Sequence, residues 1–163
     1  MISKQSTTVY KRILIPTDGS ELSERAVNYG IDFAKAANAQ VTAITVSTPF
    51  HAVAFEPVDT LESFTTRMSR VAAKWLAYVQ DVAAAAGVSC ETVHVQHEHP
   101  YKAIIDTATD RGCDLIVMAS HGRRGLSAIV LGSETVKVLT HSTIPVLVYR
   151  EKPGKLPPYF AAS

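Results

Sequence analysis

The sequence predicts an α/β fold built on one doubly wound, five-stranded parallel sheet. Short runs of β-branched and apolar residues alternate with longer amphipathic segments along the 163-residue chain. This alternation is typical of a parallel sheet with helices on both faces. The run 114–118 (DLIVM) is almost continuously apolar, as expected of a central parallel strand that is covered on both sides.

The first half of the chain contains two short strand signals and two helix signals. Residues 12–17 (RILIPT) and 41–46 (VTAITV) are the strand-like runs, and between them apolar residues recur at helical spacing over 22–37. The turn sequence Asp-Gly-Ser separates the first strand from this helix. Apolar residues three and four positions apart then predict a long helix over 61–86, which Gly87 ends.

The second half continues the same alternation. Residues 88–96 alternate as a third strand, and Pro100 opens a shorter helix that extends to about Ala108. After the apolar run 114–118 and a glycine-bearing loop, residues 133–141 predict the last helix. Residues 145–149 (PVLVY) then form the fifth strand, which we expect at an edge of the sheet.

Composition and charge exclude several classes of protein. The chain has 47% hydrophobic and 19% charged residues and a formal net charge of +1, so electrostatics give no reason to expect nucleic acid or an anionic membrane as its main partner. No apolar run is long enough to span a membrane, and the first residues do not resemble a secretory signal. Cys90 and Cys113 show no Cys-x-x-Cys spacing. We therefore expect buried thiols in the reducing cytoplasm.

In a doubly wound sheet, ligands bind beyond the carboxyl ends of the strands, where the strand order reverses. The loops after the first and fourth strands are therefore the candidate sites. The second of these loops contains Gly122 and Gly125, and Gly132 stands directly before the predicted helix at Ser133. Glycines let backbone amides approach a phosphate, and the start of a helix attracts anions. The same residues could instead form an ordinary turn and a helix N-cap.

A longer comparison of motifs makes the prediction more specific. The run 118–150 (MASHGRRGLSAIVLGSETVKVLTHSTIPVLVYR) resembles the C-terminal signature of the universal stress protein family, whose nucleotide-binding members carry Gly-x2-Gly-x9-Gly-Ser/Thr. Gly122, Gly132 and Ser133 match this motif, and the runs ILIPTDGSE and PVLV are also similar to the family. The resemblance covers residues 10–150. It implies a Rossmann-like, adenine nucleotide alpha hydrolase-like domain over 1–150 with strand order 3-2-1-4-5. The tail over 151–163 has three prolines and one glycine, and we expect it to be flexible.

One position departs from the motif, because Ala119 stands where the family has its first glycine. If the backbone there needs a positive φ, alanine would cost about 1 kcal/mol. If only a small side chain is needed, alanine is tolerated.

The resemblance implies a site for ATP or AMP, with Mg²⁺ accompanying ATP. Adenine would lie against the backbone of Val46, the ribose near Asp18 and Ala119, and the phosphates on the amides of Gly122, Gly132 and Ser133. Asp18 could instead cap the first helix, unless Ser20 does so. Arg123 and Arg124 could contact phosphate from the rim or serve the acidic surface of a partner. The remaining implied pocket residues are Pro16, Thr17, Met118, His121, Glu134 and Thr135.

The resemblance further implies a regulatory or stress-response sensor rather than an enzyme. No fixed general base is evident from the sequence, so we expect slow ATP hydrolysis at most. Two alternatives remain: a nucleotide-free protein-interaction module of the same fold, and a slow hydrolase that uses His121. The resemblance also implies a homodimer in which strand 145–150 pairs with its twin. The resemblance also allows a regulatory protein partner, which the sequence does not identify.

The sequence lacks the motifs of several other nucleotide-binding, hydrolase and signalling proteins. The chain has no Walker A motif, no Gly-x-Gly-x-x-Gly after the first strand and no Gly-x-Ser-x-Gly elbow. It also lacks the phosphoacceptor aspartate that a response-regulator receiver needs after its third strand. His94, His97 and His99 invite a metal interpretation, but no further ligands complete a set of four. We expect these histidines at the end of the third strand, leading to the helix at Pro100.

Overall fold

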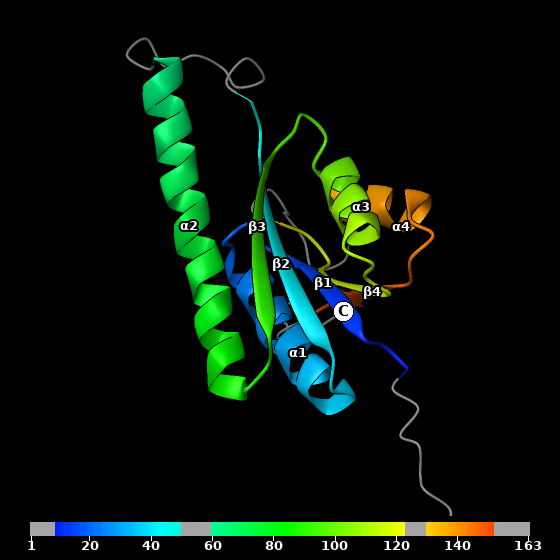
Figure 1. The fold of residues 1–163 in the computed structure, drawn as a ribbon. Coiled ribbons are helices and arrows are strands. Elements are labelled where there is room, and N and C mark those ends of the chain that lie inside the picture. The colour runs from blue at the N-terminus through cyan, green and yellow to red at the C-terminus, as the bar shows by residue number, and fades with distance from the viewer. Residues whose placement is uncertain (1–8, 50–59, 123–129, 152–163) are drawn as a thin grey trace, which may run out of the picture.

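The computed structural model describes residues 9–49, 60–122 and 130–151. Its sheet has the order β3-β2-β1-β4-β5, and all four pairs of neighbouring strands are parallel (Figure 1). The predicted fold class and strand order are therefore confirmed. The strands are β1 (Arg12–Pro16), β2 (Gln40–Ser47), β3 (Cys90–Gln96), β4 (Leu115–Ala119) and β5 (Val146–Tyr149).

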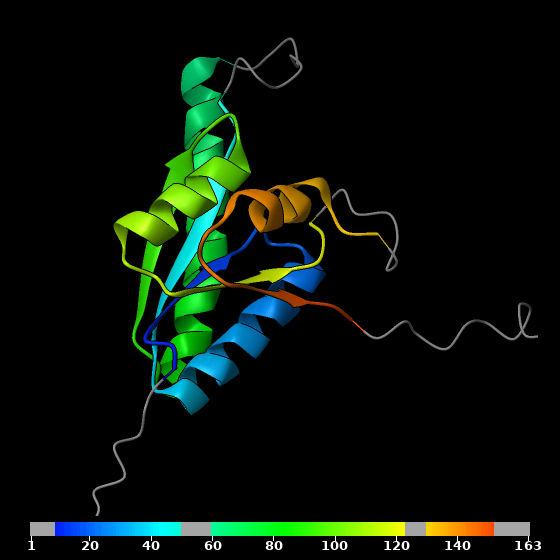
Figure 2. The same cartoon turned by 90° about the vertical axis from the view of Figure 1, so that its right-hand side faces the viewer.

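Four helices cover the two faces of the sheet. One face carries α1 (Glu21–Ala37) and α2 (Leu61–Ala86), and the opposite face carries α3 (Pro100–Asp110) and α4 (Ser133–His141) (Figure 2). None of the helices in the described part of the chain is long and apolar enough to cross a membrane.

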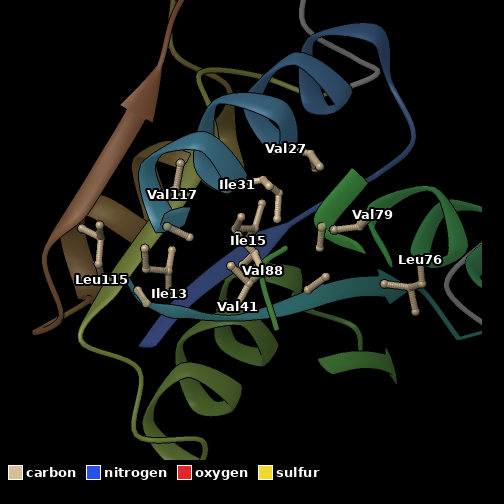
Figure 3. Close-up of a cluster of buried hydrophobic side chains, with 14 residues drawn as sticks. Ile13, Ile15, Val27, Ile31, Val41, Leu76, Val79, Val88, Leu115 and Val117 are labelled. Carbon is tan, nitrogen blue, oxygen red and sulfur yellow. The ribbon is translucent and has the colours of Figure 1, made fainter. Parts of the chain in front are cut away.

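The core consists of two apolar layers, one on each face of the sheet. Ile13 and Ile15 of β1 point toward α1 and α2, where they pack with residues such as Ile31 and Val79 (Figure 3). Leu14, between them, points to the opposite face and packs with residues of α3 and α4. This alternation follows from the two-residue period of a strand. Because both faces are covered, the central strands are apolar throughout.

The helix boundaries follow from capping chemistry. Ser20 is the N-cap of α1, and Thr60 and Ser63 form a capping box at the start of α2. Gly87 ends α2 with a left-handed φ of 73°. The predicted bounds of α2 and α4 agree with the structure at both ends.

The third strand begins two residues later than predicted. Val88 donates its backbone N–H to Ala83 O at 2.9 Å, which completes the C-terminal cap of α2. The apolar side chain of Val88 therefore belongs to the helix end and to the core, and pairing with β2 starts at Cys90.

The two cysteines differ in burial. Cys113 is buried, as expected, whereas Cys90 is only half-buried, and both are free. Burial raises the pKa of both thiols above the ordinary value. Both side chains are therefore protonated at neutral pH.

Candidate functional site

The strand order reverses between β1 and β4, so the residues that follow these two strands form one edge of the fold. Pro16 ends β1, and Thr17 connects that strand to β2: its N–H donates to Ile44 O at 2.8 Å, and its carbonyl accepts from Thr45 Oγ1 at 2.6 Å. The Thr17 hydroxyl lies 2.7 Å from Ser23 Oγ. Thr17 is buried and therefore shapes the turn from within.

Asp18 lies half-buried at the start of this turn, and Ser20 holds one of its carboxylate oxygens. Asp18 Oδ1 accepts from the Ser20 N–H at 3.0 Å and from the Ser20 hydroxyl at 2.6 Å. Ser20 Oγ in turn accepts from the Ser23 N–H at 3.2 Å and so caps α1. The open question about Asp18 is thereby answered, because Ser20 is the cap.

The second carboxylate oxygen of Asp18 meets the loop after β4. A Cβ atom added to Gly122 would overlap Asp18 Oδ2. Gly122 does not have a positive φ, unlike Gly19, Gly87 and Gly112. Glycine at residue 122 leaves room for the carboxylate and does not provide an unusual backbone conformation, because an added Cβ would displace the end of the Asp18 side chain.

Gly132 closes the other end of the same loop. Its N–H donates to Ser120 O at 2.8 Å, and an added Cβ would lie 3.0 Å from the Cα of His121. Its φ is −63°, so here too glycine provides close packing, and an added Cβ would push against the backbone of His121. Arg123 and Arg124, predicted at the rim, lie outside the described residues.

The helix α4 begins beside this contact. Its N-cap is Gly132, which offers no side chain to bond the first amides, and Ser133 is exposed. The side chains of the next two predicted site residues, Glu134 and Thr135, form hydrogen bonds with other parts of the protein. Thr135 Oγ1 donates to Ala119 O at 3.0 Å and is buried. Glu134 Oε2 accepts from the Tyr101 N–H at 2.9 Å, so this carboxylate caps α3, which has no side-chain cap of its own.

The structure answers the question that Ala119 raised. Ala119 is the last residue of β4 and pairs with Tyr149 of β5. Among the described residues other than glycine, only Asn38 has a positive φ. Alanine therefore meets no backbone strain at residue 119. The neighbouring side chain of Met118 is buried in the core on the α3 and α4 face.

Val46 of β2 lies past the point where the neighbouring strand β1 ends. The last residue of β2 that pairs with β1 is Ile44, whose carbonyl accepts from Thr17, whereas Ser47 O accepts from His97 N on the β3 side at 2.9 Å. Because successive residues of a strand direct their backbone groups to opposite neighbours, Val46 directs its N–H and C=O to the side where β1 has ended.

The histidines do not converge on a common point. His99 is the N-cap residue of α3, as expected of the segment before Pro100, and its N–H donates to His97 Nδ1 at 2.8 Å. His94 Nε2 instead lies 2.9 Å from Ser47 Oγ. His121 Nδ1 lies 3.2 Å from the hydroxyl of the adjacent Ser120. No group of three or more potential metal ligands occurs within residues 9–49, 60–122 and 130–151.

One neighbour of the site was missed from sequence. Gly19 has a φ of 70°, and an added Cβ would overlap the indole of Trp75, which α2 brings against the turn after β1. The helical spacing of Trp75 predicted only a core position. Two hollows in the described part of the chain lie elsewhere: one of about 470 Å³ at the amino ends of β1 and β2, and one of about 380 Å³ between α2 and β3.

The fold and the site geometry define a doubly wound α/β protein whose two central loops meet at the carboxyl edge of the sheet. Residues 9–150 match the model of the universal stress protein family. The chain is also 33% identical over 154 residues to universal stress protein MJ0531 of Methanocaldococcus jannaschii, covering 94% of this chain and 89% of that protein. The chain belongs to the universal stress protein family.

Solved structures agree with this assignment. The structure of MJ0577 from the same organism has a TM-score of 0.74 and 29% identity, covering 89% of this chain and 99% of that one. A universal stress protein in complex with cAMP has a TM-score of 0.67 and 26% identity, covering 88% of this chain and 99% of that one.

Proposed function

We propose that this universal stress protein binds an adenine nucleotide, ATP or AMP, at the carboxyl ends of β1 and β4 and acts as a regulatory or stress-response sensor. The contact between Asp18 and Gly122 carries the proposal, because a Cβ atom at residue 122 would occupy the space beside the carboxylate. A carboxylate accepts hydrogen bonds from hydroxyl groups, and a bare backbone beside it lets a ligand approach closely. The related structure with cAMP supports an adenine nucleotide as the ligand class.

Each part of the nucleotide has a candidate partner in this proposal. The outward backbone groups of Val46 would bind the adenine edge, and Asp18 would accept from the ribose hydroxyls. The amides of Gly122, Gly132 and Ser133 would bind the phosphates at the positive end of α4. Mg²⁺ would accompany ATP, held by phosphate oxygens and water.

The proposal is tested by looking for bound nucleotide. The purified protein is denatured and the released small molecules are identified by mass spectrometry. Nucleotide-free protein is then titrated calorimetrically with ATP plus Mg²⁺ and with AMP. We expect recovered nucleotide or micromolar binding. Absence of nucleotide together with no binding heat up to about 1 mM would contradict the proposal and favour the nucleotide-free interaction module.

A matched pair of variants locates the site. Asp18→Asn keeps the size of the side chain but removes its charge, and should weaken binding about tenfold, since a hydrogen bond to a charged group contributes about 1.5–3 kcal/mol. Asp32→Asn makes the same change at an exposed position of α1 and should have no effect. Equal affinities for the two variants would argue against Asp18 as the ribose ligand.

The same preparation tests for turnover. The proposal expects slow hydrolysis of ATP at most, because His121 is partnered only with the adjacent Ser120 hydroxyl in the described contacts. Steady-state turnover that disappears in His121→Ala, with ATP binding retained, would instead assign a slow hydrolase.

The proposal includes a homodimer through residues 145–150. β5 lies at one edge of the sheet and its four residues are half-buried. Ser120 N donates to Tyr149 O, so Tyr149 faces β4 and the adjacent Val148 directs its backbone groups outward. Val136 and Leu139 of the nearby α4 are 45% and 42% exposed. Light scattering should give a dimeric mass that Val148→Pro converts to a monomer, and a monomeric mass for the unaltered protein would contradict the dimer.

The proposal also covers location and boundaries. It places the protein in the cytoplasm, where Cys90 and Cys113 would stay reduced. Residues 1–150 would form the universal stress protein domain, and residues 151–163 would follow it as a flexible tail.

A further inference from the structure

The edge of the sheet at β3 offers backbone hydrogen-bonding groups to a partner. Val41 N donates to Ser89 O and His97 N donates to Ser47 O, both at 2.9 Å, so the odd-numbered residues of this segment face β2. In the described part of the chain, β3 pairs with β2 alone. The residues that direct their N–H and C=O away from the sheet are therefore Cys90, Thr92, His94 and Gln96.

A groove runs beside this edge. It measures about 380 Å³ and lies between β3 and α2, which stands alongside the strand in Figure 1. The helix side of the groove is lined by Ser69, Ala73 and Ala77, whose side chains are small, and by Gln80. Thr92 and His94 line the strand side. If a partner added a strand to β3, every second side chain of that strand would point toward this groove, which has space for it.

The helix side of the groove is positively charged. Arg70, Lys74 and Asp81 are the charged residues of the segment 69–81, and all three are exposed. Because they stand three or four positions from Ala73 or Ala77, they lie next to the groove on the surface of α2. Partial burial lowers the pKa of His94, so its imidazole is neutral at pH 7. The two cations outnumber the one carboxylate, so the helix side of the groove has a net positive charge.

We propose that the β3 edge and the adjoining α2 groove bind an extended, acidic segment of a partner protein as an added strand. Main-chain hydrogen bonds to Thr92 and His94 supply the pairing, and small side chains of the segment enter the groove. Carboxylates of the segment contact Arg70 and Lys74. This surface lies on a different edge of the fold from the nucleotide site and does not depend on the proposed nucleotide binding.

The test uses two blocked ten-residue peptides, one alternating threonine with glutamate and the other threonine with lysine. Binding to the full chain is followed by fluorescence anisotropy and by exchange protection of the Thr92 and His94 amides. We expect the glutamate peptide to protect these amides and to bind about tenfold or more tightly than the lysine peptide, with an affinity that falls as salt rises.

Three variants separate the contributions to binding. Thr92→Pro removes one outward N–H without removing a bond to β2, and Ala73→Met fills the groove at an exposed helix position without changing its charge. Lys74→Glu reverses one of the two charges. Each should weaken binding of the glutamate peptide about tenfold, whereas Lys102→Glu, the same reversal on an exposed residue of α3, should not.

Two results would overturn the proposal. One is no protection of the Thr92 and His94 amides at millimolar glutamate peptide, or binding that persists unchanged in both Thr92→Pro and Ala73→Met. The other is protection of the same amides that rises with protein concentration in the absence of peptide, which would assign the edge to self-pairing.

Discussion

Two pairs of glycines at opposite ends of the sheet have different physical roles, whereas Gly19 after β1 combines a positive φ with a close neighbour, Trp75. At the amino end, Gly87 and Gly112 have φ angles of 73° and 62°, and an added Cβ would meet nothing within 4 Å. At the carboxyl end, Gly122 and Gly132 have no positive φ, but an added Cβ would meet Asp18 and His121. The first pair provides a backbone conformation, and the second pair provides close approach.

Because of this difference, a substitution in the first pair should affect stability, and a substitution in the second pair should affect binding. A side chain at residue 87 or 112 strains the folded backbone far from the candidate site. A side chain at residue 122 or 132 displaces the groups from which that site is built. In the sequence all four residues look alike, as glycines next to a helix or strand end.

The largest effect is expected from Gly132→Val. Its Cβ would lie 3.0 Å from the Cα of His121, a backbone atom that cannot move without shifting the loop. The first turn of α4 would then move away from Gly122. Calorimetric titration should show at least about 100-fold weaker nucleotide binding, while circular dichroism shows a retained fold. Wild-type affinity in a folded Gly132→Val protein would remove Gly132 from the site.

Gly122→Ala should weaken binding less, by about tenfold, because it displaces the carboxylate of Asp18 rather than a backbone segment. The effect should be non-additive with Asp18→Ala, since the two residues act through one contact. A double-mutant cycle measured by calorimetry tests this. Additive losses would mean that Gly122 affects the ligand independently of Asp18.

Gly87→Ala and Gly112→Ala should reverse the pattern. Each places a Cβ at a left-handed backbone and should lower the free energy of unfolding by about 1 kcal/mol, while leaving nucleotide affinity unchanged. Urea denaturation and calorimetry on the same samples measure the two quantities. A loss of affinity without a loss of stability would contradict the distinction between the two ends.

Among the substitutions at the carboxyl end of the sheet, Ala119→Gly should have the smallest effect on binding. The residue lies in β4 without a positive φ, so restoring the glycine of the family motif relieves no strain. We expect nucleotide affinity to change less than about threefold, and the free energy of unfolding to fall by about 0.5–1 kcal/mol because glycine weakens a strand. A tenfold gain in affinity would instead show that the alanine side chain obstructs the ligand.

Local patterns in the sequence were sufficient for the order of helices and strands along the chain. The 61–86 helix was predicted to the residue because a long apolar stripe and Gly87 define it without help from other elements. The strand order came from resemblance to the family, and the structure confirms it. Asp18 and Gly122 follow β1 and β4 and lie close together, as predicted, because the carboxyl ends of parallel strands share one edge.

Only the tertiary structure decided what several side chains do within that architecture. Glu134 matches a site position in sequence but caps α3, since packing of α3 against α4 brings it to the Tyr101 amide. Trp75 reads as an ordinary core residue but lies against Gly19. The backbone of Ala119 was ambiguous until β4 was seen to continue through it. Periodicity and capping are local properties that a sequence displays directly, whereas these contacts join residues far apart in the chain and exist only once the sheet has brought them together.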